Sequence, residues 1–284
     1  MARLLKGFPV AKKLTDELTV RVAALKDRGI TPTLAIVRVG EREDDLSYER
    51  GATKRCDAVG IAVRMFVLPA DCTQEQLLQV IGDVNADTDI HGCLMFRPLP
   101  SSLDEAAACA ALDPAKDVDC ITQSSLFGIF ANQSLGFPPC TAEACIQLLD
   151  YYGYDLAGAN VAVVGRSLVI GKPVAMMLQA KNATVTMCHT RTRDLDAHCR
   201  RAEIVVVAAG HIGTVGANAA NEGQVVVDVG INWDEKAGKL CGDVLFDEVE
   251  PKVSAITPVP GGVGAVTTAV LAKHVVEAAE RAHA

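Results

Sequence analysis

The chain of 284 residues lacks the features by which membrane proteins and nucleic-acid-binding proteins are usually recognised. Half of its residues are hydrophobic, yet no segment approaches the roughly 20 uncharged residues that a membrane span requires. Acidic residues outnumber basic ones and give a formal net charge of −8, which disfavours binding to nucleic acid or to anionic lipid. The N-terminal segment Met1–Gly7 has no apolar core of signal-peptide length. We therefore expect a cytoplasmic protein with no nucleic-acid or membrane partner.

Closely spaced cysteine pairs are also missing, although the chain contains 10 cysteines. No two of them stand three positions apart, so neither a zinc site nor a thioredoxin-like motif is indicated. Several lie in apolar runs, as Cys93 does beside Leu94 and Met95, where a thiol behaves as a small hydrophobic group. We expect reduced thiols in the core and no bound metal.

Short apolar segments alternate with helical patterns along the whole chain, and aromatic residues are few. The sequence predicts strands at about 33–37, 63–68, 91–96, 160–164, 184–188, 204–208 and 224–228. Helical spacing is found at about 10–28, 73–85 and 266–281. Two further helices are predicted, one that ends at about residue 59 and one that begins at about residue 172. Strands joined by helices predict an α/β fold with parallel sheets, divided near Pro138–Tyr154.

The complete glycine fingerprint of dinucleotide-binding proteins is absent, but a partial one follows the strand predicted at 160–164. Gly165 begins a turn that ends at Gly171, and Ser167 occupies the place of the usual second glycine. A strand that enters a glycine turn and then a helix places phosphate on the N–H groups of the helix N-terminus. The alternative is an ordinary strand-to-helix turn without a ligand.

An acidic residue is missing at the end of the next predicted strand, where many such domains bind the free ribose hydroxyl of NAD. Thr190 and Arg191 stand there instead, and Arg166 lies in the glycine turn. Two arginines favour a 2′-phosphate, so we predict NADP rather than NAD. The alternative is that Arg191 belongs to a solvated surface.

Six further segments are more specific than the general pattern of an α/β fold. They are Lys116–Asp119, Pro139–Thr141, Gly165–Ser167, Asp228–Asn232, Gly242–Val244 and Thr257–Gly264. In this order and spacing the chain resembles the methylenetetrahydrofolate dehydrogenase/methenyltetrahydrofolate cyclohydrolase family. The resemblance covers essentially the whole chain.

This resemblance implies a two-domain α/β protein with a cleft between the domains, acting in one-carbon folate metabolism. Residues 1–145, completed by the C-terminal helix 265–284, would form the folate-binding domain, and residues 146–264 a Rossmann-type dinucleotide domain. The implied reaction is oxidation of 5,10-methylenetetrahydrofolate to the methenyl cation. In bifunctional members the cation is then hydrolysed to formyltetrahydrofolate. The resemblance also implies a homodimer that binds one-carbon derivatives of tetrahydrofolate.

The resemblance carries roles onto individual positions. Tyr48 would pack on the folate, and Asp119 would hydrogen-bond the pterin; a half-buried helix tyrosine and a loop cap are the alternatives. Pro260, Gly261 and Gly262 would line the folate pocket. The implied cofactor-binding residues are Gly165, Arg166, Ser167, Gly171, Thr190, Arg191 and Ile231.

The family's catalytic lysine and its glutamine partner are both absent from this chain. Ala52 stands at the lysine position, one helical turn after Tyr48, and Phe96 stands at the glutamine position. Arg55 and Arg97 are possible substitutes. Arg55 returns to within ~20° of the helix face of Tyr48, but arginine holds its proton too tightly for a good general base. Cys120 also replaces the glycine that normally follows the aspartate.

These replacements predict a dehydrogenase with weak or lost cyclohydrolase activity. Hydride transfer needs close positioning and exclusion of water, whereas hydrolysis also needs a group that activates water. Three alternatives stay open: a fully bifunctional enzyme, a catalytically silent folate-binding paralogue, and a dehydrogenase for an altered pterin.

Overall fold

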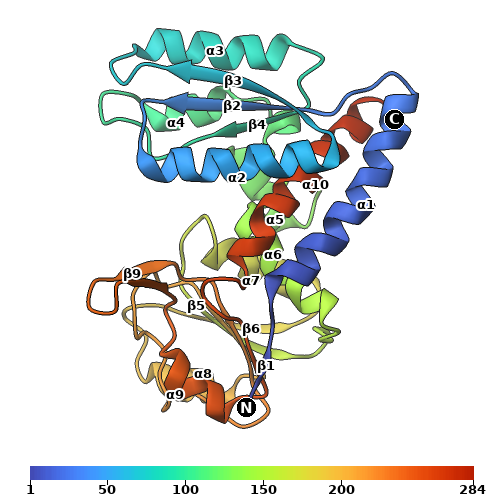
Figure 1. Cartoon of the computed structure of the whole chain (residues 1–284). Coiled ribbons are helices and arrows are strands. Elements are labelled where there is room, and N and C mark those ends of the chain that lie inside the picture. Colours follow the sequence, from blue (N-terminus) through green and yellow to red (C-terminus); the bar gives the residue numbers. More distant parts are fainter. The chain divides into compact units, whose positions relative to one another are not determined.

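The computed structural model describes residues 1–284, which divide into two compact units (Figure 1). The first unit comprises Met1–Lys12 and Thr141–Thr267, and the second comprises Lys13–Cys140 and Thr268–Ala284. The two-domain α/β architecture predicted from the sequence is therefore observed. The grouping of residues 1–12 differs from the sequence-based division, which placed them with the N-terminal half.

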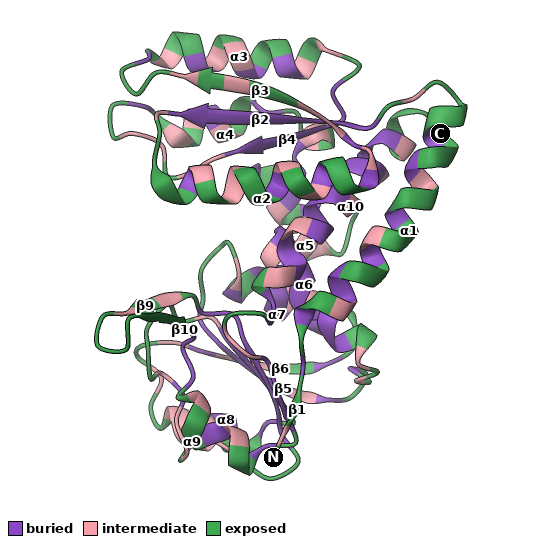
Figure 2. Cartoon of the chain, viewed as in Figure 1, coloured by how far each residue is buried: buried purple, intermediate pink, exposed green.

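The second unit is built on a three-stranded parallel sheet in the order β3-β2-β4. These strands are β2 (Thr33–Val39), β3 (Ala62–Leu68) and β4 (Gly92–Met95). Every residue of the central strand β2 is buried, as Figure 2 shows, because helices cover both of its faces. The strand accordingly has a continuous apolar run, interrupted only by Arg38.

Helices on either side of this sheet begin and end at the signals found in the sequence. Figure 1 shows α3 (Gln74–Ala86) and α2 (Glu43–Val59) on opposite faces. Thr73 and Gln76 form the predicted capping box, and Gly60 ends α2 in a left-handed conformation. The remaining elements are α4 (Glu105–Ala111), the 3-10 turn η1 (Pro114–Lys116) and α5 (Gln123–Ala131). Two long helices, α1 (Gly7–Asp27) and α10 (Gly264–Ala282), have their first residues in the first unit and the remainder in the second.

The first unit contains a six-stranded parallel sheet in the order β1-β11-β8-β7-β5-β6. Its strands are β1 (Arg3–Leu4), β5 (Asn160–Val164), β6 (Thr184–Cys188), β7 (Ile204–Val207), β8 (Val225–Asp228) and β11 (Ala255–Ile256). From β5 the chain passes to β6 on one side and then to β7 on the other. The strand order thus reverses at β5, and ligands of such sheets bind outside the carboxyl ends of the strands at that point.

Short elements complete the first unit. These are α6 (Cys140–Tyr151), α7 (Gly171–Ala180), α8 (Leu195–Arg201), β9 (Asn232–Asp234), β10 (Lys239–Cys241), α9 (Phe246–Val249) and the 3-10 turn η2 (Glu250–Lys252). Strands β9 and β10 form an antiparallel hairpin. The seven predicted strands are all present, whereas β1, β9, β10 and β11 were not predicted, because strands of two or three residues are too short to show periodicity.

The structure shows the state of the cysteines, which the sequence predicts to be reduced thiols in the core. All ten cysteines are free, and eight of them are buried. None of the helices is long and apolar enough to cross a membrane.

Candidate functional site

The turn that joins β5 to α7 has close backbone packing that only glycine permits. Gly165 has a φ of +138°, and a Cβ built on it would lie 2.2 Å from the carbonyl oxygen of Ala208. A Cβ on Gly171 would lie 2.4 Å from the carbonyl oxygen of Gly165. Both distances are shorter than any normal contact, so the two glycines let the turn fold tightly against the end of the sheet.

Ser167, in the place of the missing glycine, shapes this turn with its hydroxyl. Its Oγ accepts the backbone N–H of Ile170 at 3.1 Å and that of Gly171 at 3.4 Å. The backbone N–H groups of Leu168 and Val169 donate to no atom of the chain. A loop with available N–H groups at a helix N-terminus has the geometry and the partial positive charge to hold a phosphate. The residues present therefore fit a dinucleotide cofactor.

Three predicted cofactor residues lie exposed at the same edge of the sheet. Because β5 and β6 are parallel neighbours, the loop at His189–Thr192 emerges beside the glycine turn. His189 shapes this loop: its N–H donates to Thr192 Oγ1 at 2.8 Å, and its Nδ1 accepts the Arg191 N–H at 3.1 Å. Thr190, Arg191 and Arg166 are exposed, and neither arginine makes an ion pair. Two cationic side chains are thus free to meet an anion.

Two buried aspartates, Asp228 and Asp243, connect the neighbouring loops through hydrogen bonds. The sequence analysis assigned no role to either of them. Asp228, at the end of β8, accepts the N–H groups of Gly230, Asp243 and Val244 at 3.0, 3.1 and 3.0 Å. Asp243 in turn accepts those of Ala209 and Gly210 at 2.6 and 2.8 Å. Burial raises the pKa of Asp228 to about 6, against the opposing effect of the three N–H donors.

This network explains two of the sequence motifs without assigning them a direct role in chemistry. A Cβ on Gly242 would lie 1.8 Å from Asp228 Oδ2, and one on Gly230 would lie 2.3 Å from Asp243 Cγ. The glycines beside the aspartates are therefore required by their carboxylates. Both aspartates lie in motifs found in the sequence, Asp228–Asn232 and Gly242–Val244, and the glycines in these motifs were the signal that could have indicated the network.

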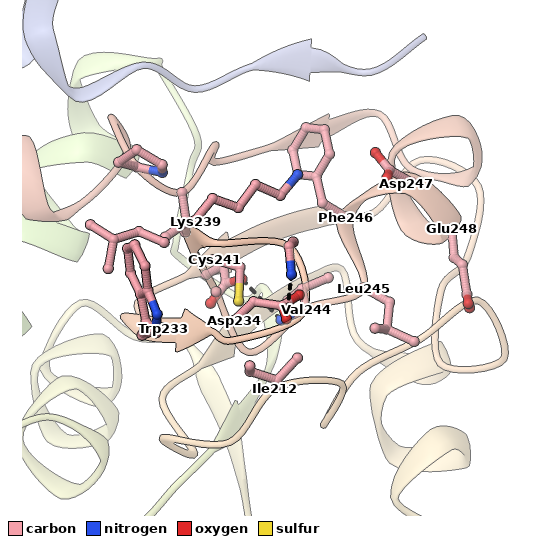
Figure 3. Close-up of a pocket in the computed structure, with 16 residues that line it drawn as sticks. Ile212, Trp233, Asp234, Lys239, Cys241, Val244, Leu245, Phe246, Asp247 and Glu248 are labelled. Carbon is pink, nitrogen blue, oxygen red and sulfur yellow. Dashed lines mark hydrogen bonds between the residues drawn. The ribbon is translucent and has the colours of Figure 1, made fainter.

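The same network borders a cavity of about 870 Å³ in the first unit (Figure 3). Trp233, Leu245 and Ile212 line it, and all three are substantially exposed. Ile231, the last predicted cofactor residue, is 65% exposed on the loop that follows β8. Pro260 lines the cavity as well.

The loop Thr257–Gly264 packs tightly on the start of α1. The Gly7 N–H donates to the Gly261 carbonyl oxygen at 2.9 Å, and a Cβ on Gly262 would lie 2.5 Å from the Pro258 oxygen. Pro260 and Gly261 are exposed, whereas Gly262 is buried. The first two are therefore available to a ligand, and the third serves the close packing of the loop.

In the second unit the structure brings Tyr48 together with Phe96. Tyr48 lies on α2, Phe96 follows β4, and their rings meet edge to face with centroids 5.9 Å apart. Burial, together with the nearby Cys140 and Asp119, raises the pKa of Tyr48 well above its usual value. The phenol therefore stays protonated through the physiological range.

Asp119 lies near Tyr48 and is also shielded from water. Its Oδ1 accepts the Cys140 backbone N–H at 3.1 Å. Burial raises its pKa, while the bond from Cys140 opposes that effect. Cys120, which follows it, has a φ of +60°, a conformation that a glycine adopts without strain. A cysteine therefore occupies a backbone conformation that favours glycine.

Ala52 is fully buried, and neither predicted substitute is free of protein contacts. Arg55 Nη1 donates to Thr15 Oγ1 at 2.6 Å, and its Nε lies 3.5 Å from Thr268 Oγ1. Arg97 Nη1 lies 3.7 Å from Glu105 Oε1. Burial lowers the pKa of Arg55, which still leaves a guanidinium charged at neutral pH.

A buried ion pair next to Tyr48 was missed by sequence reasoning. Arg38 Nε donates to Glu49 Oε2 at 2.8 Å, and Arg38 also donates to the Gly40 carbonyl oxygen. Only 7% of the Arg38 side chain is exposed. The sequence signal was Arg38 itself, a charged residue within the apolar run of β2. Its ion pair connects this central strand to the turn of α2 that contains Tyr48.

The six-stranded parallel sheet, its glycine turn and the N–H groups at its switch point define a dinucleotide-binding α/β protein of two units. Comparison with known proteins narrows the class. Residues 5–119 match the catalytic domain, and residues 139–283 the NAD(P)-binding domain, of tetrahydrofolate dehydrogenase/cyclohydrolase. The chain belongs to this enzyme family.

Individual members of the family are similar to this chain over nearly their whole lengths. The bifunctional protein FolD of Carboxydothermus hydrogenoformans is 51% identical over 281 residues, which are 99% of this chain and 98% of the relative. The crystal structure of the bifunctional enzyme FolD of Campylobacter jejuni has a TM-score of 0.95 at 37% identity, with 99% of each chain covered. FolD of Trypanosoma brucei, complexed with NADP cofactor and inhibitor, has a TM-score of 0.92 at 36% identity, with 99% of this chain and 98% of that chain covered.

Proposed function

We propose that this enzyme oxidises 5,10-methylenetetrahydrofolate to 5,10-methenyltetrahydrofolate with NADP, and that its cyclohydrolase activity is weak or lost. The observation that carries the proposal is that Ala52 and Phe96 stand at the positions for which the resemblance implies a lysine and a glutamine. Neither a methyl group nor a phenyl ring can accept a proton from water or orient it. Phe96 packs edge to face on Tyr48. Its aromatic ring therefore occupies the position where the resemblance implies the amide of a glutamine.

In this proposal the first unit binds the dinucleotide. The backbone of Gly165–Gly171 receives the pyrophosphate, Arg166, Thr190 and Arg191 receive the 2′-phosphate, and Ile231 also contacts the cofactor. The exposure of both arginines and the absence of an acidic residue at the end of β6 support NADP over NAD. The T. brucei relative, which was solved with NADP, supports the same choice. When bound, the nicotinamide ring supplies the hydride acceptor.

The second unit, in this proposal, binds the folate. Tyr48 offers an aromatic face for packing, and Asp119 offers a shielded carboxylate for the N–H groups of the pterin. The resemblance also assigns folate binding to Pro260, Gly261 and Gly262. Oxidation requires these groups to hold the substrate in position and to exclude water, which none of the replacements prevents.

The second candidate is a fully bifunctional enzyme, which the name of the C. hydrogenoformans relative, bifunctional protein FolD, favours. In that case Arg97 is the better substitute, because Arg55 is held by the hydroxyls of Thr15 and Thr268. Arg97 lies directly after Phe96 and retains 28% exposure of its side chain. It would act by electrostatic stabilisation and not as a base.

A paired spectrophotometric assay on the purified protein tests the proposal. One reaction follows the reduction of NADP or NAD by methylenetetrahydrofolate, and the other follows the decay of methenyltetrahydrofolate. We expect rapid oxidation with NADP and decay at the buffer-catalysed rate. Decay well above that rate would establish the bifunctional candidate, and absence of both activities would favour a silent folate-binding paralogue or an altered pterin.

We also propose that the protein acts as a cytoplasmic homodimer. The exposed apolar side chains of Trp233, Leu240 and Leu245, which lie together around the hairpin and α9, support self-association through the first unit. Light scattering coupled to size-exclusion chromatography measures the mass directly. A particle of twice the chain mass is expected, and a monomer at micromolar concentration contradicts the proposal.

A further inference from the structure

The second unit contains a cavity of about 560 Å³ that the proposed reaction does not use. It lies at the amino end of β4, where His91 directly precedes the strand, whereas Phe96 follows the carboxyl end of the same strand. Figure 1 shows the C-terminus on the side of the sheet from which the strands start. The cavity is therefore separated from Tyr48 by the length of the sheet.

The charged groups that line this cavity are all cationic or able to become so. Lys116, Arg281, His91 and His283 line it, and no aspartate or glutamate does. This is unusual for a chain with a net charge of −8. Asp87 and Asp89, the carboxylates closest in sequence to His91, form ion pairs with Arg64 at 2.5 and 3.7 Å.

Two of these cations are fixed in place by the protein backbone. Lys116 Nζ donates to the carbonyl oxygens of Val84, Asn85 and Asp87 at 2.7, 3.0 and 2.6 Å. Arg281 Nη1 donates to the Gly136 oxygen at 3.1 Å, and its guanidinium lies 4.2 Å from the centroid of the Phe137 ring. Neither makes an ion pair, so their charges are available to a ligand in the cavity.

The two histidines meet through their ring nitrogens on the wall of the cavity. His91 Nε2 lies 3.2 Å from His283 Nε2, and His91 Nδ1 accepts the Thr33 backbone N–H at 3.2 Å. Because Nδ1 is an acceptor, the proton of neutral His91 is on Nε2 and is donated to His283. This arrangement satisfies both rings only while both are neutral.

When the His91–His283 pair takes up one proton, the hydrogen bond between the two rings is lost, and the pair can bind an anion instead. If His283 gains a proton on Nε2, two N–H groups point at each other, and they can be satisfied together only by an acceptor between them. The oxygens of a sulfate, phosphate or carboxylate group are such acceptors. Ile90, Leu135 and Ala278 supply apolar wall beside this point.

We propose that this cavity binds a small molecule that bears an oxyanion group on an apolar body, and that binding is coupled to protonation of the His91–His283 pair. Burial is the main effect that disfavours the charged form of His91; His283 and Lys116 act in the same direction, whereas Asp89 and Asp87 favour the charged form. A bound anion reverses that balance, because it places negative charge beside the two rings. Affinity must therefore rise as the pH falls.

Two probes with pH-independent charge test this coupling: sulfate, which lacks an apolar body, and benzenesulfonate, which has one. Their binding is followed through the histidine ring signals in NMR spectra of the full chain at pH 7.5 and 5.5. We expect both probes to bind at least ~10-fold more tightly at pH 5.5, and benzenesulfonate more tightly than sulfate at each pH. Equal affinity at both pH values, or no shift of the His91 and His283 signals at saturating probe, would overturn the proposal.

His283→Gln is the informative variant because His283 is exposed near the end of α10, so its replacement leaves the core intact. We expect it to abolish the pH dependence and to weaken benzenesulfonate binding by at least ~10-fold. His198→Gln, on α8 of the first unit, is the matched control and should change neither quantity. Arg281→Gln should weaken binding at both pH values while the pH dependence remains. Unchanged binding in the His283→Gln protein would show that the histidine pair is not the site.

Discussion

The ring of Phe96 stands edge-on to the ring of Tyr48, with their centroids 5.9 Å apart and their planes at 82°. Tyr48 and Ala52 are four residues apart on α2, so they share one helix face. The resemblance to the family assigns catalysis to these three positions, and in this chain they hold an aromatic pair and an alanine. This arrangement allows a direct test by substitution.

The double variant Ala52→Lys/Phe96→Gln is expected to gain methenyltetrahydrofolate hydrolysis. A lysine with an amide partner can activate and orient water, which is worth ~10²-fold in rate. The single variant Ala52→Lys should gain little and should be less stable, because its ammonium group would be buried against Phe96 without a partner. Rates of methenyltetrahydrofolate decay and of NADP reduction are measured for all three proteins. Equal hydrolysis by the wild type and the double variant would refute our account of these positions.

Arg191 is predicted to select NADP through the charge of its guanidinium. Arg191→Asp should reduce kcat/KM for NADP by ~10²-fold, since it removes one charge-assisted contact and adds repulsion. The value for NAD should change much less, because a carboxylate can bind the free ribose hydroxyl. Arg193→Asp, two positions along the same loop and also exposed, is the control. An equal loss with both cofactors would show that Arg191 does not contact the 2′-phosphate.

Gly171 is predicted to be essential for the phosphate turn. Gly171→Ala places a methyl group 2.4 Å from the Gly165 carbonyl oxygen, and only movement of backbone can relieve that contact. We expect cofactor affinity to fall at least ~10-fold, because the displaced turn no longer presents its N–H groups. Gly82→Ala is the matched control: Gly82 is in α3, with nothing within 4 Å of an added Cβ. That substitution should stabilise the protein by ~0.5–1 kcal/mol and leave cofactor affinity unchanged.

Stability should fall in mildly acidic solution because of His91. Burial lowers the pKa of His91 below its usual 6.5, so the unfolded chain takes up its proton before the folded one does. The resulting contribution to stability is complete above pH ~6.5 and is lost as the pH falls through the folded pKa. Asp228, whose pKa is raised to about 6, acts in the opposite direction: its effect stabilises at low pH and is lost as the pH rises.

The variant His91→Asn separates the two effects. The asparagine Oδ1 can accept the Thr33 N–H as Nδ1 does, but the side chain does not titrate. Urea unfolding at pH 7.5 and 5.5 should therefore show a smaller loss of stability in the variant than in the wild type. Since Asp228 is the same in both, its contribution cancels in the comparison. A variant that loses as much stability as the wild type would assign the acid sensitivity to another group.

Strands of four residues or more could be predicted from the sequence because most of their residues are apolar, and β2, β4, β7 and β8 are buried along their whole length. The capping box at Thr73 and the turn at Gly165 could be predicted because local hydrogen bonds and steric limits define them. The network of Asp228 and Asp243 could not, since it depends on loops from three strands that meet only in the folded sheet. The contact of Arg55 with Thr15 and Thr268 was inaccessible for the same reason: it joins three helices distant in sequence.

Strand β1 pairs with β11, so Arg3 lies opposite Ala255 in the sheet. During synthesis, β1 therefore has no partner until Ala255 and Ile256 of β11 have been translated. The three-stranded sheet of the second unit, whose last strand ends at Met95, can assemble much earlier. The outer edge of the larger sheet must close last. Until it does, β8 has an unpaired edge, and a nascent chain that stalls before Ala255 exposes that edge to other polypeptides.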